Sequence, residues 1–547
     1  MENFFSSYRQ NIDGLLLAPE AFRLFRDLKG NAVPCEAYTP ALISLAKSKA
    51  QADFPLLPMS LYRQYDTIGN RKNFENLYFA RRRISEALLM GEFCEGKGRF
   101  TEKLADALWA IMEETTWVLP AHISHIGAEG KSAALKGLPL SYDGRVRYID
   151  LFAGDTAGLI AWALYLMGDA MREDYPVVID RMRFELQRRI IQPFLTDDTY
   201  WWMGTKGNTL NNWTPWIVSN ILTVCALTES DPAQRAAVVG KCLKILERFI
   251  RKYPEDGGCD EGPGYWNVAG ASFFDCCELL YDLTGGKLNV FDQPLLRKMG
   301  EYIANVNICR EYNLNFADAD ARVRPNAQLI MRFGRRCGSE MLYTYGAYVA
   351  GWSQVQPTFS CGQGYRTFKS ICENNPPAQK PYQAPAHVWM PNLEVMAARE
   401  PSDTGECRAD KGLYLAMKGG HNAESHNHND VGNVLVYCDG EPFLIDVGVG
   451  TYTADTFNRE PKTICFNWML RDAPCAIDDA CGKIDFANGL TCTFDHAHLQ
   501  SELEELPLTD PRFQSAWRRE GLYRLKLRSK EPLASGTFTL KIRHTKN

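Results

Sequence analysis

The sequence lacks an excess of basic residues. Its 547 residues include 61 Lys and Arg against 66 Asp and Glu, which gives a formal net charge of −5. Proteins that bind nucleic acid or an acidic membrane surface over much of their area are usually basic, so both classes are disfavoured. No apolar run approaches the roughly 20 residues that a membrane span requires. We therefore expect neither a nucleic-acid nor a membrane partner.

Signals for export and for disulfide bonding are also lacking. The first residues contain no basic segment followed by an apolar core, which a signal peptide requires. The 17 cysteines are odd in number, scattered, and without a Cys-x-x-Cys pair, so a disulfide framework is not expected. These features predict a cytoplasmic protein with reduced thiols. A periplasmic or secreted protein is the alternative if a leader has been removed.

Helical periodicity dominates the first two thirds of the chain. Apolar residues recur every three or four positions in segments such as 179–190, and Asp231-Pro232 is typical of a helix start. The segment 159–167 is apolar on most of its surface, which predicts a buried helix that ends at Gly168-Asp169. Helices of this length joined by short turns predict hairpins stacked in a ring or solenoid.

The period changes after a proline-rich segment, which holds four prolines in residues 374–385. The alternating runs 434–438 and 442–445 flank Asp439-Gly440, the signature of a β-hairpin. The runs 522–527 and 537–542 also alternate. The sequence therefore predicts an α+β multidomain chain: a helical domain over 1–373, a linker over 374–387 and an antiparallel β domain over 388–547.

A histidine-rich stretch is the most concentrated chemical feature. Three of the nine histidines, His421, His426 and His428, fall within eight residues. Imidazoles at this density suit proton transfer, anion recognition or metal binding, and a polar loop before a strand is the alternative. Asp446 follows an apolar strand, and together with His428 it could hold a divalent metal.

Two segments of the helical part suit a carbohydrate. Asn211, Asn212 and Trp213 place side-chain amides beside an indole, a combination that hydrogen-bonds hydroxyls and carboxylates and stacks on sugar rings. A helix cap with a structural tryptophan is the alternative. The glycine-rich loop 256–266 places acidic residues and Tyr265 at the mouth of a helix, although a lone tyrosine identifies no enzyme.

Together these blocks resemble the heparinase II/III family of polysaccharide lyases, alginate lyase-like relatives included. The resemblance extends from about residue 55 to about residue 452, and the order and separation of the blocks match. It is carried by Asn211-Asn212-Trp213, by residues 260–265, by the histidine-rich stretch 419–433 and by residues 441–448. It implies an incomplete (α/α) toroid followed by an antiparallel β-sandwich-type domain. Because the family pattern is lost from about Lys462, we expect that second domain to be shortened.

The resemblance also implies a reaction, the cleavage of uronate-containing poly- or oligosaccharides by β-elimination. It makes Asn212 a donor to the uronate carboxylate, Tyr265 the acid and, in a syn reaction, also the base, and His426 the alternative base. Asn211, Trp213, Glu261 and His122 are the expected substrate-binding residues. No organic cofactor is expected, and the oligomeric state is left open, with a dimer as one option.

The resemblance implies a structural zinc as well, with His428 and Asp446 as two ligands. The third ligand of the family, a later histidine, has no counterpart in residues 468–475, although Asp472, His496 or His498 could substitute. Zinc binding is therefore left open.

Two other functions compete with a lyase. A toroidal glycoside hydrolase would need two carboxylates across the scissile bond, for which Asp256, Asp260 and Glu261 are available. A glycan-binding protein without turnover is the other alternative. The identity of the uronan, endo or exo action, and syn or anti elimination stay open.

Overall fold

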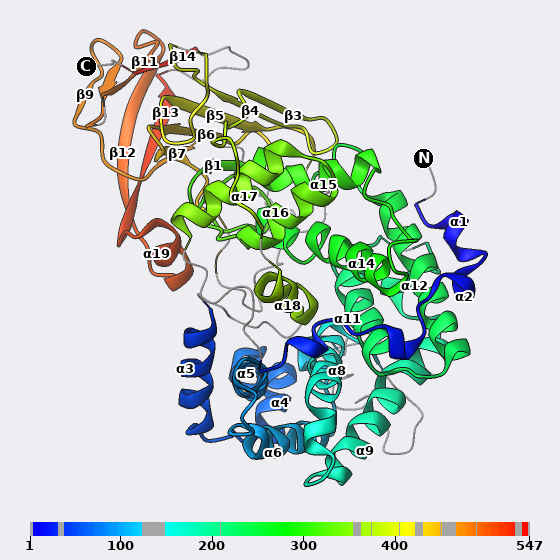
Figure 1. The fold of residues 1–547 in the computed structure, drawn as a ribbon. Helices are drawn as coiled ribbons and strands as arrows, with labels where there is room; N and C mark the ends of the chain where they lie inside the picture. The colour runs from blue at the N-terminus through cyan, green and yellow to red at the C-terminus, as the bar shows by residue number, and fades with distance from the viewer. Residues whose placement is uncertain are drawn as a thin grey trace.

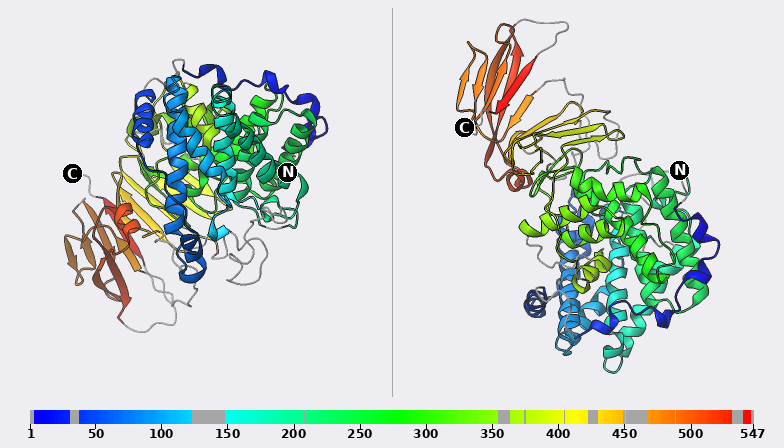
Figure 2. Two further views of the ribbon diagram at one scale, coloured as in Figure 1. Left: turned by 90° about the horizontal axis from the view of Figure 1, so that it is seen from below. Right: turned by 45° about the horizontal axis from the view of Figure 1, so that its top comes forward.

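The computed structural model describes residues 4–30, 38–122, 148–207, 209–353, 363–373, 375–403, 405–421, 430–448, 450, 467–487, 489–530 and 539–544. Helices occupy the chain as far as Cys372, and strands dominate from His387 onward (Figure 1). The two parts lie against each other, with the sheets at one end of the helical body (Figure 2).

The helical part is an arc of helix pairs. Helices α5, α8, α11 and α14 are largely buried and follow one another along the arc, while α6, α9, α12 and α15 pack against them. Helix α18 contacts α8, α14 and α16 and lies in the middle of the helical body (Figure 1). The helices are α1 Ser6–Arg9, α2 Ile12–Leu15, α3 Thr39–Ala50, α4 Met59–Ile68, α5 Lys72–Glu95, α6 Thr101–Met112, α8 Leu151–Met171, α9 Pro176–Leu186, α10 Gln192–Thr196, α11 Trp213–Thr228, α12 Pro232–Lys252, α13 Pro263–Trp266, α14 Gly270–Leu283, α15 Pro294–Asn305, α16 Ala327–Arg336, α17 Glu340–Trp352, α18 Gly364–Cys372 and α19 Pro511–Trp517.

Helix α8 shows how composition decides burial. It begins where the Asp150 side chain accepts the Ala153 N–H at 2.7 Å, a standard N-cap. It is long and apolar enough to cross a membrane, but 94% of its most apolar window is buried among the other helices. The predicted end at Gly168-Asp169 is wrong, because Gly168 is helical and the helix continues to Met171. The glycine does not end the helix because it sits buried against Leu164 and Ile179.

Helix α12 begins as predicted. The Asp231 side chain accepts the Ala233 N–H at 3.1 Å, and Pro232 occupies the first turn. Proline suits this position because its missing N–H would have had no helical partner.

Two antiparallel sheets form the C-terminal part. The larger has the order β12-β13-β8-β7-β6-β5-β4-β3 and the smaller has the order β14-β11-β10-β9. A two-stranded hairpin of β1 and β2 lies in the helical part. The strands are β1 Asn307–Cys309, β2 Tyr312–Asn313, β3 His387–Met390, β4 Val395–Arg399, β5 Leu413–Lys418, β6 Val434–Cys438, β7 Glu441–Ile445, β8 Asn467–Leu470, β9 Ala476–Asp478, β10 Lys483–Asp485, β11 Leu490–Phe494, β12 Leu499–Pro507, β13 Gly521–Ser529 and β14 Leu540–His544.

The larger sheet lies between the helices and the smaller sheet. Along β6, Leu435 and Tyr437 belong to the core shared with the helices, whereas Val436 and Cys438 belong to the core between the two sheets. This is the two-residue alternation of a strand that is buried on both faces. The sheet therefore joins the helical body to the outer sheet.

The hairpin of β6 and β7 is confirmed. Asp439 and Gly440 both have positive φ, 48° and 79°, as a two-residue hairpin turn of this hand requires. A side chain at Gly440 would approach the Cys309 sulfur to 2.7 Å, so glycine also permits the close contact with β1.

Candidate active site

The start of α11 positions the two asparagines. The Asn211 side chain accepts the Trp213 N–H at 3.1 Å, so the Asn211 side chain satisfies one of the orphan donors of the first turn. The Asn212 side chain makes no capping hydrogen bond. Its amide is therefore available for a contact outside the helix.

Glu261 makes that contact. The Asn212 Nδ2 donates to Glu261 Oε2 at 2.7 Å, and the Asn212 backbone N–H donates to Glu261 Oε1 at 3.4 Å. Both side chains are buried, with Asn212 3% and Glu261 1% exposed. A charge-assisted hydrogen bond in a buried setting is strong and fixes the orientation of the amide. One of the two amide hydrogens of Asn212 is thereby assigned to Glu261.

A tight turn places Tyr265 next to this pair. Gly262 precedes α13 with φ of 92°, a conformation that side chains rarely adopt. A Cβ at this position would lie 2.8 Å from the Phe316 carbonyl oxygen and 2.9 Å from the Ala319 Cβ. Glycine thus lets the segment 316–319, which follows β2, pack directly against the turn that carries Tyr265.

That segment supplies Asp318, which the sequence analysis missed. Asp318 is buried and forms a hydrogen bond with the half-buried Tyr265. Burial raises the pKa of the Tyr265 hydroxyl well above its usual range, and the nearby carboxylates of Asp318 and Glu261 raise it further. Arg512, from α19, opposes the shift but does not reverse it. Tyr265 is therefore a protonated phenol at neutral pH, ready to donate a proton.

Residues 315–317 also contact two acidic residues that follow the three histidines in the sequence, Asp430 and Asp446. The Ala317 N–H donates to the buried carboxylate of Asp430, and Asn315 Nδ2 donates to the Asp446 carbonyl oxygen at 3.0 Å. Ala317 has a positive φ of 60°, which is unfavourable for alanine and marks a constrained position. The predicted site residues His426 and His428 lie outside the described residues.

Asp446 has several hydrogen-bond donors around it. One carboxylate oxygen accepts from the Asn433 amide, and the other accepts the Gly448 N–H at 2.6 Å. Each carboxylate oxygen has a second lone pair, so these hydrogen bonds are compatible with metal binding. They hold the Asp446 carboxylate in a fixed orientation just after β7.

The proposed substitutes for a third zinc ligand have partners of their own. Asp472 accepts a hydrogen bond from Arg519 at 2.7 Å, and His498 Nδ1 lies 2.7 Å from Asp495. Among the residues described, one group of three side chains could hold a metal: Cys438, Asp439 and His544. It contains neither Asp446 nor the substitutes proposed from the sequence.

His122 lies beside Trp213. Its Nδ1 is 2.7 Å from the buried Asp150 carboxylate, and its ring is 4.7 Å from the Trp213 ring, centre to centre. It also stacks on Phe152 at 5.5 Å. Asp150 caps α8 at the same time, so the start of that helix fixes the position of the imidazole.

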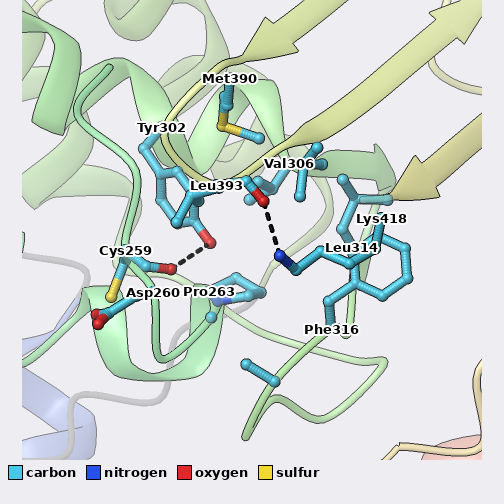
Figure 3. Close-up of a pocket in the computed structure, with 13 residues that line it drawn as sticks. Cys259, Asp260, Pro263, Tyr302, Val306, Leu314, Phe316, Met390, Leu393 and Lys418 are labelled. Atoms are coloured by element: carbon cyan, nitrogen blue, oxygen red, sulfur yellow. Dashed lines mark hydrogen bonds between the residues drawn. The ribbon is translucent and has the colours of Figure 1, made fainter. Parts of the chain in front are cut away.

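A small cavity lies beside the turn 259–263, where the helical part meets the larger sheet (Figure 3). It measures about 20 Å³, which is room for one water molecule. The buried Lys418 donates to the Leu393 carbonyl oxygen at 2.7 Å on one side, and Tyr302 donates to the Cys259 carbonyl oxygen at 3.2 Å on the other. These contacts join the turn before α13 to the strand region that carries Leu393 and Lys418.

The described part of the predicted site therefore comes together in space. Asn212 donates a hydrogen bond to Glu261, and the charge of Glu261 raises the pKa of Tyr265. The Trp213 ring contacts the His122 ring. Asp318 was missed, although acidic residues between small ones in 317–321 were a visible signal. Arg512 was missed because nothing in the sequence indicates that α19 reaches this site.

Comparisons with known proteins identify the fold. No protein-family model matches the chain, and no curated protein sequence matches it. Among solved structures, a heparinase III with methylated lysines aligns with a TM-score of 0.50 and 12% identity, over 96% of this chain and 93% of that one. A heparan sulfate lyase HepC mutant from Pedobacter heparinus has a TM-score of 0.47 and 11% identity, over 93% of this chain and 87% of that one. The chondroitin AC lyase of Streptomyces coelicolor A3 has a TM-score of 0.43 and 10% identity, over 96% of this chain and 82% of that one.

The first alignment spans nearly the whole of both chains. The chain therefore has the fold of that heparinase III, a polysaccharide lyase fold, and the expected order of a helical part followed by a β part is confirmed. At this level of identity the similarity establishes the fold alone.

Proposed function

We propose that this chain is a lyase that cleaves uronate-containing poly- or oligosaccharides by β-elimination. The observation that carries the proposal is the cluster of Asn212, Glu261 and Tyr265, in which an oriented amide lies near a phenol held in its protonated form. The fold shared with a heparinase III supports the same class of reaction.

The chemical difficulty of the reaction explains the amide. The proton at C5 of a uronate is a poor acid, because its removal places a second negative charge next to the carboxylate. A donor aimed at that carboxylate stabilises the transition state more than the ground state. Asn212 is that donor, and Glu261, through its hydrogen bond at 2.7 Å, keeps the amide plane in place.

The raised pKa assigns Tyr265 to one half of the reaction. A base removes the C5 proton, the electron pair forms the C4–C5 double bond, and the C4–O4 bond breaks. The departing O4 takes its proton from the Tyr265 hydroxyl. The phenolate that this leaves is then protonated again from solvent. Because the phenol resists ionisation, Tyr265 serves as the acid, and we assign the base to His426.

The remaining side chains would bind the substrate. Trp213 offers a ring for stacking on a sugar, and His122, oriented by Asp150, offers its other nitrogen. Asn211 completes this face of the site. A zinc ion on His428 and Asp446 would have a structural role only, and no step of the reaction passes through it.

An absorbance assay tests the proposal. Wild-type protein is incubated with heparan sulfate, hyaluronan, chondroitin sulfate and alginate, and with oligosaccharides of each, while the absorbance of a 4,5-unsaturated uronate is followed. Tyr265→Phe should reduce the rate by roughly 10²- to 10⁴-fold, the usual contribution of a positioned acid. Tyr523→Phe, a change in strand β13, is the matched control and should keep the wild-type rate.

Two results would contradict the proposal. Reducing ends that form without this absorbance would indicate hydrolysis and move attention to the carboxylates. Binding without any turnover, unaffected by Tyr265→Phe, would indicate a glycan-binding protein.

A further inference from the structure

A second polar cleft lies at the junction of the helical part and the larger sheet. It has a volume of about 850 Å³ and is lined by the β1–β2 turn and the end of α17 on one side. The start of β5 and the β6–β7 turn line the other side. It lies at the opposite end of β5 from the candidate active site. That strand begins after Lys411 and ends at Lys418, just before the histidine-rich stretch, so the two ends of Leu413–Lys418 are about 17 Å apart.

The uncompensated charge in this cleft is positive. Glu311 alone receives three guanidinium groups, those of Arg322 at 2.5 Å, Arg324 at 3.1 Å and Arg518 at 2.8 Å. Arg310 and Lys411 are exposed, and neither has an ion pair within the described part of the chain. An anion in the cleft would therefore meet cations that the protein itself does not neutralise.

The carboxylates of the cleft, by contrast, are engaged. Glu441 accepts from Arg471 at 2.5 Å, Asp410 accepts from Arg408 at 3.1 Å, and the Asp439 side chain accepts the Gly412 N–H at 2.9 Å. Glu441 and Asp410 are thus paired with arginines, Asp439 is bound to a backbone N–H, and Arg310 and Lys411 are the lining cations that have no ion pair among the described residues.

Three buried donors belong to residues in or beside the cleft. Arg471 Nε and Trp352 Nε1, both on lining residues, and Arg322 Nε beside Glu311 are buried and have no hydrogen-bond acceptor among the described residues. Because these nitrogens are buried, the donors that a ligand can reach include the exposed side chains of Arg310 and Lys411. The half-exposed Trp352 adds an aromatic ring to this set.

We propose that this junction cleft is a second binding site, one that takes an acidic saccharide through its carboxylate or sulfate oxygens. Guanidinium groups pair with such oxyanions, and the indole supplies a face for the sugar ring. The site differs from the candidate active site in position and in residues, and it requires no catalysis.

A spectroscopic titration tests this site directly. The protein is labelled with fluorotryptophan, and the resonance of Trp352, one of 12 tryptophans, is assigned with Trp352→Phe. The probes are an unsaturated sulfated heparin disaccharide, which has no further linkage to eliminate, sodium sulfate, and neutral lactose, all at constant ionic strength. We expect the disaccharide to shift the Trp352 resonance and lactose to leave it unchanged.

The variant Arg310→Ala/Lys411→Ala should weaken that binding by roughly tenfold or more, since two charge-assisted contacts are lost. Arg83→Ala/Lys97→Ala, an equal loss of exposed charge on the helical part, should not change it. Equal affinity in the first variant, no shift with the disaccharide, or an equal shift with lactose would overturn the proposal. A shift with sulfate but not with the disaccharide would overturn the assignment to a saccharide. The readout does not depend on turnover, so a failed elimination assay leaves it valid.

Discussion

At the scale of single residues, the protonation state of Tyr265 is set by its neighbours. Burial makes the largest contribution to its raised pKa, followed by the charge of Asp318, the charge of Glu261 and the hydrogen bond to Asp318. All four favour the neutral phenol, the form that a general acid needs before the reaction. The pH dependence of activity should therefore report on Asp318.

Asp318→Asn should move the alkaline limb of the kcat/KM profile to lower pH. The substitution removes a carboxylate that raises the pKa of Tyr265, so the phenol ionises at lower pH and the acid is lost earlier. The measurement is a pH–rate profile together with a tyrosinate absorbance titration. Asp292→Asn is the matched control, because Asp292 is an exposed aspartate just before α15 and does not act on Tyr265. An unchanged limb in Asp318→Asn would contradict this account.

Glu261→Gln tests the orientation of the Asn212 amide. The new side-chain NH2 would face either the Asn212 Nδ2 or its backbone N–H, both donors, so the amide should rotate out of place. We expect kcat to fall by about 10²-fold with a small change in KM, because the lost contact is made chiefly in the transition state. Glu229→Gln, a buried glutamate just after the other end of α11, should keep the wild-type kcat. A change confined to KM would assign Glu261 to substrate binding instead.

The residue types at the site could be predicted, but their contacts could not. The sequence indicated Asn211, Asn212 and Tyr265 because amides, aromatics and a glycine-rich turn have recognisable chemistry. Asp318 and Glu261 act through distance and burial, which no local pattern encodes. The roles of His426 and His428 stay predictions.

At the scale of elements, one glycine connects two segments of the site. Gly262 allows the turn before α13 and the segment after β2 to touch, and a methyl group would collide with the Phe316 carbonyl oxygen and the Ala319 side chain.

Gly262→Ala should destabilise the protein by about 1–3 kcal/mol, because it adds a backbone clash to an unfavourable φ. It should also lower kcat, since Asp318 would move away from Tyr265. Urea denaturation and steady-state kinetics measure both effects. Gly264→Ala is the control in the same turn, because its Cβ would meet nothing within 4 Å. Equal behaviour of the two variants would refute the close-packing argument.

Element boundaries were predictable where the signal was local. Asp231-Pro232 starts α12, and Asp439-Gly440 turns between β6 and β7, because capping and turn geometry depend on neighbouring residues. The end of α8 was not predictable, because packing against Leu164 and Ile179 keeps Gly168 in the helix.

At the scale of the whole molecule, buried tyrosines tie stability to pH. Burial raises the pKa of Tyr345, Tyr365 and Tyr437 well above the usual value. In the unfolded chain these groups ionise near pH 10. A group whose pKa is raised by folding stabilises the protein fully below that pH, and this contribution is lost as the pH rises above it.

The free energy of unfolding should therefore fall steeply above about pH 10. Urea denaturation between pH 8 and pH 11 measures the slope. Tyr437→Phe should reduce that slope at little cost at neutral pH, because the Tyr437 hydroxyl is buried without a hydrogen-bond partner among the described residues. A slope that is identical in the variant would show that this tyrosine does not contribute.

The division into a helical part and a sheet part was visible as a change in period from 3.6 to 2. How the sheet packs on the helices was not, because residues such as Leu435 and Tyr437 only acquire helical neighbours in the folded chain. The junction cleft is a product of that packing, which explains why the sequence analysis did not find it.

The central claim, elimination with Tyr265 as the acid, is tested most directly by weighing the products. Oligosaccharide cleaved in ¹⁸O-labelled water is analysed by mass spectrometry, with wild-type protein and Tyr265→Phe side by side. Elimination adds no water, so the product masses should sum to the mass of the substrate, with no label in either fragment, and the variant should form almost none of them. Products that together gain one labelled water would show hydrolysis and contradict the account.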